Sequence, residues 1–452
     1  MTLKRKILAG LASLLAAGLT LTACGSPAPT NTGGTTAPST GGGGGGGGDQ
    51  VVKFWSWNPD ENTAKPYIAA FEASHPGIKI EHRFIQYSDY VNTTQLGLQS
   101  GSGPDVFGLQ VGALTNQFAP LAADLAPALA ETVGADWADK LISVDQLKVD
   151  DKQVAVPWMV TGGGLVWANQ TLVDSLNLTV PTTKAELLTF CAAVKQAGKT
   201  CMIQGAKDAW QNIDVYQAII NQIAPGEFYK ALDGQASFTG DAFVTAFGTF
   251  KALFDDGVFQ DGALGMTAYP DANDAFKKGE AALIAFGTWQ NSDTTKTRLA
   301  QYAETYGDAF DTKTVFMPYA FPLLQEGGTT GKLFGGPDVG FAVAANSKVS
   351  DAATTFALWL TASEEGQKMM AKTVQQPALK SVPLDLSDVS TPEQVTALES
   401  QGPALADMIG PREIQSADVR TALGDALSAV ASGQQSPQDA AAAVQTAIDA
   451  SK

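Results

Sequence analysis

The sequence predicts an α/β protein built of two lobes, and three observations support this. The 452 residues exceed the roughly 250–300 residues at which a single hydrophobic core stops growing. Short apolar runs alternate with amphipathic stretches through residues 51–109, and a similar pattern restarts after residue 183. Between these regions lies Val154–Asn169, which contains Gly162-Gly163-Gly164. We interpret this segment as a crossing between the lobes that lines the gap between them.

The first region alternates strands and helices in a regular order. Strands are expected at residues 51–57, 78–85 and 105–109. One helix precedes the stop at Pro76-Gly77, and a second covers residues 87–99. The order strand–helix–strand–helix–strand is typical of a parallel sheet with covering helices. A hairpin is expected over Leu147–Val156, with Asp150-Asp151-Lys152 at its turn.

The second region begins with a helix start signal. Thr183 and Glu186 form a capping box, and the helix that follows ends by Gly198. A helix over Asp241–Asp256 carries phenylalanines at near-helical spacing, and we expect this stripe to be core: Phe243, Phe247, Phe250 and Phe254. Further strands are expected at residues 201–204, 281–286 and 339–344, and further helices at 350–360, 363–373, 416–431 and 437–450.

The N-terminus has the features of an export signal followed by a tether. Lys4-Arg5-Lys6 precede an apolar run over Ile7–Leu21, which is shorter than the ~20 residues that span a bilayer. Leu21-Thr22-Ala23-Cys24 resembles a bacterial lipoprotein signal, in which residues 1–23 are removed and Cys24 carries lipid; ordinary secretion with cleavage elsewhere is the alternative. Residues 24–49 are rich in Gly, Ser and Thr, and such a flexible tether spans roughly 25–30 Å.

Charge and cysteine usage narrow the possible partners. The formal net charge of −17 disfavours binding to nucleic acid and to an anionic membrane surface. The lipid anchor is therefore the only contact with a membrane that we expect. Export places Cys191 and Cys201 in an oxidising compartment, where ten residues of separation allow a disulfide. Two free buried thiols are the alternative.

Catalytic and metal-binding motifs find little support. His75 and His82 are the only histidines, which leaves little material for histidine-based nucleophilic or zinc chemistry. A glycosidase needs two carboxylates, and no motif nominates a pair among the 46 acidic residues. Gly162–Gly164 lacks the Lys-Ser/Thr of a phosphate loop, and the segment from Asp271 lacks the Gly and Glu of a calcium loop. We expect no enzyme, no cofactor and no metal.

Several motifs in a fixed order resemble one family. They are the two-tryptophan first strand, Phe71–Ile80, Gly101–Val106, Val154–Pro157 with Trp167–Asn169, Pro181–Glu186, Phe276–Leu283 with Gly287–Trp289, Asn346–Lys348 and Trp359–Glu364. Together they resemble the ABC-transporter extracellular solute-binding proteins of family 1, the maltose-binding-like group, over residues from about 50 to 452.

The resemblance implies a two-lobed periplasmic-binding-protein-like fold of class II. Each lobe would be a mainly parallel sheet with flanking helices, and three crossings would join them near residues 158–163, 334–338 and 382–392. The first lobe would then comprise residues 50–158 with 338–382, and the second 163–334 with 391–452.

The resemblance also implies a function. A monomer outside the cytoplasm would capture a carbohydrate, either a mono- or an oligosaccharide, in the cleft and deliver it to ABC-transporter permease subunits. The same fold binding a non-sugar polar solute such as a polyamine is the alternative, and a surface glycosidase is a more distant one.

Sugars present apolar faces and a rim of hydroxyls, so a site needs aromatic platforms and polar partners. Trp57 lies near a strand end, Trp158 follows Pro157 at the first crossing, and Trp289 follows Gly287. Trp210 occupies a position that resembles a sugar-stacking aromatic of the family. The family usually has Tyr where Trp158 stands. The polar candidates are Asn58, Asp60, Gln110, Thr161 and Asp338.

Overall fold

The computed structural model describes residues 49–452, all of which belong to one compact unit. The export signal, the lipid-bearing Cys24 and nearly all of the tether lie outside the described residues. Within residues 49–452, no helix is both long enough and apolar enough to cross a bilayer.

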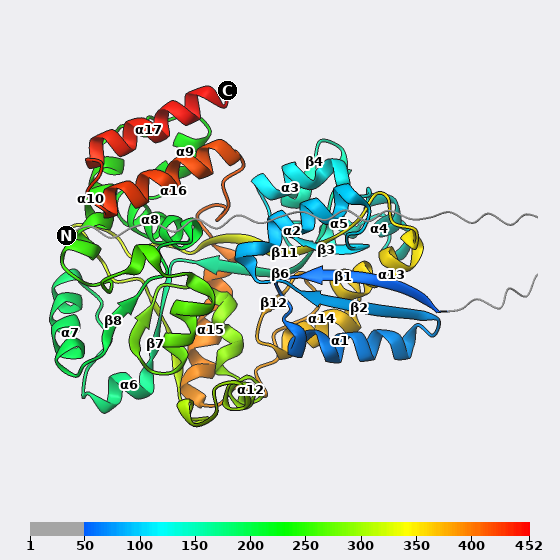
Figure 1. Ribbon diagram of the computed structural model, residues 1–452, viewed down its shortest axis with the longest axis horizontal. Helices are drawn as coiled ribbons and strands as arrows, with labels where there is room; N and C mark the ends of the chain where they lie inside the picture. Colours follow the sequence, from blue (N-terminus) through cyan, green and yellow to red (C-terminus); the bar gives the residue numbers. More distant parts are fainter. Residues whose placement is uncertain (1–48) are drawn as a thin grey trace, which may run out of the picture. The chain divides into compact units, whose positions relative to one another are not determined.

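A six-stranded sheet forms the core of the first lobe (Figure 1). Its order is β12-β6-β11-β3-β1-β2. The strands are β1 (Gln50–Ser56), β2 (Ile78–Phe84), β3 (Val106–Leu109), β6 (Val156–Gly163), β11 (Phe334–Val343) and β12 (Gln376–Pro377). Strand β1 pairs in parallel with β2 and β3, whereas β11 is antiparallel to β3 and β6, and β12 is antiparallel to β6.

A four-stranded sheet forms the second lobe, in the order β10-β7-β9-β8. The strands are β7 (Leu165–Asn169), β8 (Thr200–Ile203), β9 (Ala281–Ile284) and β10 (Phe316–Ala320). Only β8 and β9 pair in parallel. The prediction of mainly parallel sheets is therefore wrong. A chain that leaves a lobe along β6 and returns along the neighbouring β11 necessarily makes an antiparallel pair, and helix–strand alternation does not reveal this.

Helices lie on both sides of each sheet (Figure 1). The first lobe contains α1 (Glu61–Ser74), α2 (Tyr87–Ser100), α3 (Ala113–Phe118), α4 (Ala126–Thr132), α5 (Trp137–Lys140), α13 (Ser350–Ala362) and α14 (Glu364–Lys372). The second contains α6 (Gln170–Ser175), α7 (Lys184–Gln196), α8 (Ala209–Ile223), α9 (Glu227–Leu232), α10 (Asp241–Asp255), α11 (Asn273–Lys277), α12 (Lys296–Tyr306), α15 (Pro392–Ala406), α16 (Ala417–Ala431) and α17 (Pro437–Ala450).

Shorter elements connect these helices and strands. They are the hairpin β4 (Lys148–Val149) and β5 (Lys152–Gln153), and the short helical turns η1 (Ala119–Leu121), η2 (Val144–Leu147), η3 (Ala263–Gly265), η4 (Ala268–Ala272), η5 (Thr288–Thr294) and η6 (Gly307–Ala309). The hairpin confirms the expected turn at Asp150-Asp151. The capping box of Thr183 and Glu186 is also confirmed at the start of α7.

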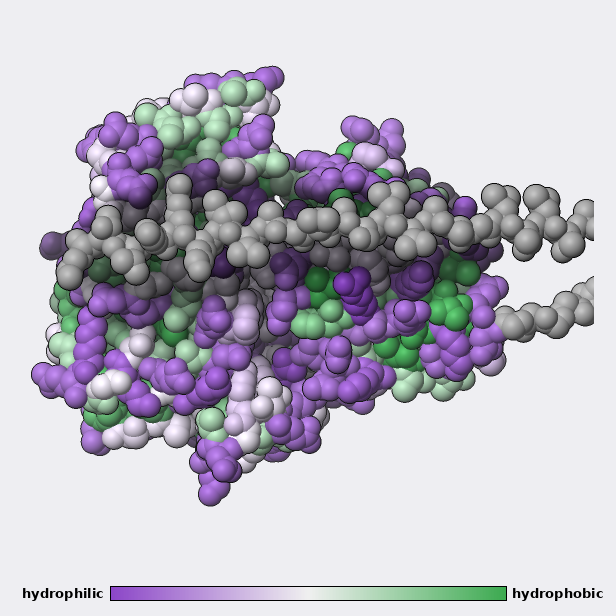
Figure 2. Space-filling model, in the orientation of Figure 1, coloured by the Kyte–Doolittle hydropathy of each residue, from purple (hydrophilic) through white to green (hydrophobic). Residues whose placement is uncertain are grey.

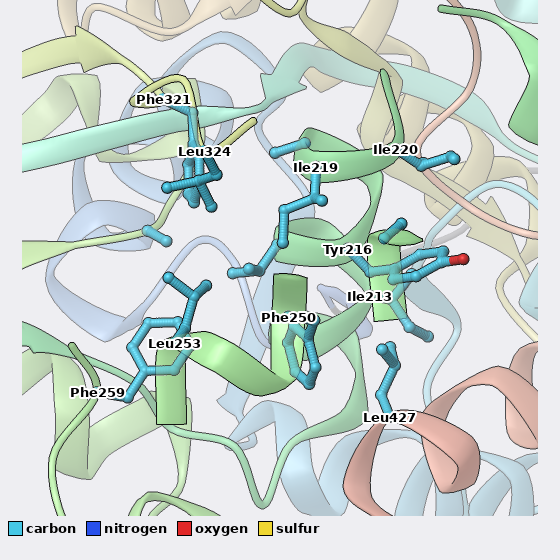
Figure 3. Close-up of a cluster of buried hydrophobic side chains, with 14 of the residues drawn as sticks. Ile213, Tyr216, Ile219, Ile220, Phe250, Leu253, Phe259, Phe321, Leu324 and Leu427 are labelled. Atoms are coloured by element: carbon cyan, nitrogen blue, oxygen red, sulfur yellow. The ribbon is translucent and has the colours of Figure 1, made fainter. Parts of the chain in front are cut away.

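The phenylalanine stripe of α10 lies in the core of the second lobe, as predicted. Phe243, Phe247 and Phe250 are buried, and Phe254 is partly buried against the same cluster. Figure 3 shows Phe250 close to Ile213 of α8 and Leu427 of α16, so that three helices share one core. This packing joins a C-terminal helix to the middle of the chain.

Replacing Phe250 with Ala should lower the free energy of unfolding by about 3–5 kcal/mol, because the side chain is fully buried and its removal leaves a cavity. Urea denaturation would measure this. Leu264→Ala is the control, since Leu264 is 36% exposed and its loss should change stability by about 0.5 kcal/mol or less. A loss below about 1 kcal/mol for Phe250→Ala would contradict the role of this core.

The segment expected to bend between the lobes is instead one continuous strand. Strand β6 runs through Trp158 to Gly163, and it pairs with β11 until Gly163 faces Phe334. A Cβ on Gly163 would lie 2.6 Å from the Phe334 ring, and Gly164 has a φ of +93° before β7 begins. The glycines therefore permit close packing of Phe334 and a turn into the second sheet. The residue boundaries of the lobes remain predictions.

The described surface exposes few large hydrophobic side chains. The visible face of the molecule carries mainly hydrophilic residues (Figure 2). Among the described residues, the exposed large hydrophobic side chains are Val51, Leu96, Leu188 and Leu264, which lie far apart in the sequence. The aromatic residues that could bind a ligand are therefore gathered elsewhere, in a cavity.

Candidate ligand-binding cleft

A cavity of about 680 Å³ lies between segments of the two lobes. The first lobe contributes residues that follow β1, β2 and β3, together with the end of α14 and the segment after β12. The second lobe contributes the start of α8, the segment around η4 and η5, and one face of α12. A cavity of this size holds a small ligand such as an oligosaccharide of a few rings.

Trp57 forms the aromatic part of the first wall. It follows β1 directly, and its ring meets Tyr90 edge-on at 4.8 Å and Tyr87 at 5.5 Å between centroids. Gly108 of β3 permits this position, because a Cβ there would lie 2.8 Å from the indole. Trp57 is half-buried, so part of its ring is open to the cavity.

The second wall carries a denser aromatic group, which includes Trp210 and Trp289. Trp210 lies in the first turn of α8 and stacks near Tyr269, at 6.0 Å between centroids; it is 9% exposed, so only a small part of its ring is open to the cavity. Trp289 lies in η5, meets Trp210 edge-on at 6.0 Å, and donates its indole N–H to the Tyr269 hydroxyl (3.1 Å). The rings hold one another in fixed orientations, which reduces the entropy cost of presenting them to a ligand.

Arg412 packs against this aromatic group, although no sequence motif marks it. Its guanidinium lies 4.5 Å from the centroid of Trp289 and 5.3 Å from that of Trp210. Its Nε donates to both carboxylate oxygens of Asp214 (2.9 and 3.0 Å), and Nη1 lies 3.2 Å from Asp338 and 3.3 Å from Glu413. Arg412 thus combines cation–π contacts with three ion pairs.

Burial and the neighbouring charges together determine the protonation states of Arg412 and its carboxylate partners. Burial alone would lower the pKa of Arg412, but the charges of Asp214, Glu413 and Asp338 raise it above its usual value, so the guanidinium stays charged. Burial raises the pKa of Asp214 to about 6, and the attraction of Arg412 offsets only part of this effect. The pKa of Asp338 is raised for the same reason.

Asp338 and Gln110 connect the two walls. Gln110 Nε2 donates to Asp338 Oδ1 (3.2 Å), the same oxygen that Arg412 Nη1 approaches, and the Tyr87 hydroxyl donates to Gln110 Oε1. Hydrogen bonds therefore connect Tyr87, which lies beside Trp57, through Gln110 and Asp338 to the Arg412 guanidinium. This guanidinium lies against the Trp289 ring. Asp338 lines the cavity, but its carboxylate already has protein partners.

A second ion pair joins the walls at Asp60 and Arg298. Asp60 caps α1 by accepting from the Thr63 amide (2.8 Å), and its other oxygen lies 2.9 Å from Arg298 Nη1 of α12. Arg298 Nε also donates to the Tyr302 hydroxyl (3.2 Å). Burial alone would raise the pKa of Asp60, but Arg298 and the Thr63 amide lower it overall. Arg298 was not predicted from the sequence.

Asp60→Asn should weaken ligand binding about two- to fivefold. The substitution keeps a capping oxygen but removes the ion pair, which is partly exposed and worth about 0.3–1 kcal/mol. The pKa of Asp60 is lowered in the folded protein, so its ion pair with Arg298 stabilises the folded state above about pH 4. This stabilisation is lost as the pH falls through the lowered pKa. Isothermal titration calorimetry would measure the affinity, with Asp136→Asn, in an exposed pair on the first lobe, as control. Equal affinities for the Asp60 variant and the unsubstituted protein would contradict the role of this pair.

The remaining sequence candidates divide by position. Trp158 borders the cavity, but it is 1% exposed and its ring packs against Tyr67 (5.7 Å) and Phe341 (5.4 Å). Its faces are therefore occupied, and the stacking platform expected there is not available. Thr161 is buried in the β6–β11 ladder and does not line the cavity. Strand β6 continues past the point where a strand end was expected, which carries Thr161 away from the opening.

The other predicted candidates all line the one cavity. They are Trp57, Asn58, Asp60, Gln110, Trp210, Trp289 and Asp338. Several lining residues were missed because no motif marks them: Tyr87, Tyr269, Arg298, Tyr302, Gln375 and Arg412. Each acquires its position through contacts with residues distant in the sequence, so strand-end position was the only usable signal.

Outside the cavity, Cys191 of α7 and Cys201 of β8 form a disulfide. It ties a helix to the edge strand of the four-stranded sheet. Within residues 49–452, no three Asp, Glu, His or Cys side chains come together in a way that could hold a metal ion.

Comparison with known proteins identifies the family. The model of the bacterial extracellular solute-binding protein family matches residues 66–397. No curated protein matches the sequence.

Solved structures with the same fold are numerous. One comes from work on xylan utilization by the thermophilic bacterium Caldanaerobius polysaccharolyticus, with 22% identity, a TM-score of 0.71, and coverage of 88% of this chain and 99% of that one. An ABC substrate-binding protein of Listeria monocytogenes, in complex with cycloalternan, has 17% identity, a TM-score of 0.68, and coverage of 89% and 99%. Maltose-bound MalE3 of T. maritima has 18% identity, a TM-score of 0.69, and coverage of 89% and 100%.

At these identities the structures establish the fold, and the family model covers well over half of the chain. The two α/β lobes and the cavity between them agree with that assignment. The chain belongs to the bacterial extracellular solute-binding proteins, a family of binding proteins rather than enzymes.

Proposed function

We propose that this protein captures a carbohydrate in the cleft and delivers it to an ABC importer. The observation that carries the proposal is the presence of aromatic rings on both walls of one cavity, Trp57 on one side and Trp210 with Trp289 on the other. Flat rings on opposing walls suit the apolar faces of sugar rings, and the amides and carboxylates between them suit hydroxyl groups.

The number of platforms agrees with useful affinity. A tryptophan that covers roughly 100 Å² of sugar contributes near 2.5 kcal/mol at about 25 cal/mol per Å². Micromolar affinity requires about 8 kcal/mol. One such ring falls far short of that value, so several rings and paired hydroxyls must contribute, and the ordering cost raises the requirement further.

The relatives named above support a sugar ligand. The Listeria monocytogenes structure contains cycloalternan, and the T. maritima structure contains maltose. A non-sugar polar solute such as a polyamine is the alternative, since its ammonium groups also suit tryptophan faces, and the ligand panel separates the two. A surface glycosidase would lie outside this family of binding proteins.

Delivery implies that the lobes close about the ligand. In our proposal, β6 and β11 form a paired crossing, the segment between residues 382 and 392 forms another, and the closed form docks on the permease subunits. The Asp60–Arg298 pair spans the cleft and would favour closure.

A sugar panel would test the proposal. Isothermal titration calorimetry against maltotriose, cellotriose, xylotriose, chitotriose and putrescine, followed by analysis of the mixture for hydrolysis products, separates the three functions. Sugar binding without turnover supports capture. Binding of putrescine without binding of any sugar would overturn the carbohydrate proposal, and hydrolysis would indicate a glycosidase.

We further propose that lipid on Cys24 anchors the protein to the outer side of a bacterial cell membrane, with residues 25–49 as the tether. Cys24→Ser should move nearly all of the protein from the membrane fraction to the soluble fraction, because the described residues contain no helix that could span a bilayer. Fractionation followed by immunoblotting would measure this. Cys201→Ser is the control and should leave the protein with the membrane; a Cys24 variant that stays there would refute the anchor.

A further inference from the structure

We infer that the cleft accepts sugars without acidic groups, and that a protonated amino group on the sugar strengthens binding. This inference rests on the proposed function, and it concerns the charge of the ligand. The observation behind it is the state of the charged side chains in the cavity: both arginines are already paired with carboxylates, whereas several carboxylates have no cation of their own.

The arginines are poorly suited to recognising an acidic sugar. Arg412 lies between Asp214, Asp338 and Glu413, and Glu413 also pairs with Arg420 at 3.7 Å, so that three negative charges already share two positive charges. Arg298 is paired with Asp60 at 2.9 Å. An anionic ligand that approached either guanidinium would also approach its carboxylate partners, and like charges in a partly buried site repel one another.

Among the residues that line the cavity, three carboxylates form no ion pair, whereas only one cation, Lys372, forms none. Asp274, Asp385 and Asp388 line the cavity, and none of them forms an ion pair with a residue in the range 49–452, although the charge of Lys372 acts on Asp385. Asp274 accepts from the Tyr306 hydroxyl (2.8 Å), and Asp388 accepts from the Thr297 amide (3.0 Å). Lys372 is the third lining cation, and its side chain is exposed. The cavity is therefore negative overall.

A separate feature favours a ligand that carries a cation. Trp210 and Trp289 both line the cavity, and the Arg412 guanidinium already lies 5.3 Å and 4.5 Å from their ring centroids. These rings therefore accept cation–π contacts in this structure. An ammonium group supplies three donors, and it also interacts favourably with the faces of Trp289 and Trp210.

Matched oligosaccharides test the charge preference directly. One series contains cellotriose, the chitosan trimer of glucosamine, and cellotriose oxidised to glucuronic acid. The other contains maltotriose and its 6-amino and 6-carboxyl derivatives. We expect calorimetry at neutral pH and low salt to show that the amino derivatives bind about three- to tenfold more tightly than the neutral parent sugar. The acidic derivatives should bind at least about tenfold more weakly than the neutral parent sugar. The amino preference should shrink as salt is added, while the affinity of the neutral sugar changes little.

Variants link the preference to the named carboxylates. In the double variant Asp385→Asn with Asp388→Asn, the ratio of amino to neutral affinity should fall towards one. Asp151→Asn is the matched control, because its side chain is fully exposed on the β4–β5 turn, and the ratio should not change. The ratio is measured within one variant, so a general loss of affinity does not affect it.

The outcomes separate this inference from the proposed function. Neutral sugars that bind, with acidic derivatives equal to them or tighter, would overturn the inference and leave carbohydrate capture intact. Putrescine that binds while no sugar of either series does would overturn carbohydrate capture itself. An amino preference that persists in the double variant would overturn the assignment to Asp385 and Asp388.

Discussion

Replacing Trp289 with Ala should weaken sugar binding roughly 50- to 100-fold. The indole presents a platform in the cavity, and loss of about 100 Å² of apolar contact removes about 2.5 kcal/mol. The effect extends beyond the ring itself, because Trp289 also holds Tyr269 by a hydrogen bond and lies against the Arg412 guanidinium. Isothermal titration calorimetry with the tightest neutral oligosaccharide of the panel would measure the loss.

The control and the related variants make the result specific. Trp137→Ala removes a tryptophan of the first lobe that does not line the cavity, and it should leave affinity within about twofold. Trp289→Phe keeps an aromatic face and should recover part of the loss. Trp57→Ala and Trp210→Ala should each weaken binding as well. If all three alanine variants bound sugar as tightly as the original protein, the cleft would not be the sugar site.

Replacing Arg412 with Met should lower the free energy of unfolding by about 3–5 kcal/mol. Methionine retains much of the volume but leaves Asp214 and Asp338 buried without their cation, while Glu413 keeps its pair with Arg420. Binding should weaken too, because Trp210 and Trp289 lose the group that braces them. Urea denaturation and calorimetry would measure the two effects separately.

A double-variant comparison isolates the charge effect. Arg412→Met combined with Asp214→Asn should be destabilised by less than the sum of the two single substitutions, because the second change removes a carboxylate that the first leaves unpaired. Lys332→Met breaks an exposed ion pair with Asp407 and should cost about 1 kcal/mol or less. An Arg412→Met variant as stable as Lys332→Met would show that the buried cluster contributes little.

The elements that could be predicted from sequence depend on local patterns. The strand at Gln50–Ser56 and the capping box at Thr183 follow from the order of neighbouring residues, and the core stripe of α10 follows from helical periodicity. Trp57 was selected because it follows a strand, and side chains at such positions open towards clefts in α/β folds. Trp289 was selected on the same reasoning.

The prediction for Trp158 rested on the expected crossing and was wrong. Pro157 and the glycines suggested a bend between the lobes, but pairing with β11 extends β6 to Gly163 and places the indole in the core of the first lobe. Whether a strand ends depends on its hydrogen-bond partner, and the partner of Gly163 is Phe334, 171 residues later in the chain (334 − 163). The direction of strand pairing, which made the sheets mixed rather than mainly parallel, has the same origin.

The sequence by itself therefore determined the α/β class, the family motifs and most of the aromatic candidates, because these depend on composition and short-range order. The export signal and the tether stay predictions. Only the tertiary structure decided which charged side chains form ion pairs. Arg412 and Asp214 are 198 positions apart, and Asp60 and Arg298 belong to different lobes. Electrostatic interactions fall off with distance in space rather than along the chain, so the charge of the cleft emerges only when the two walls are folded.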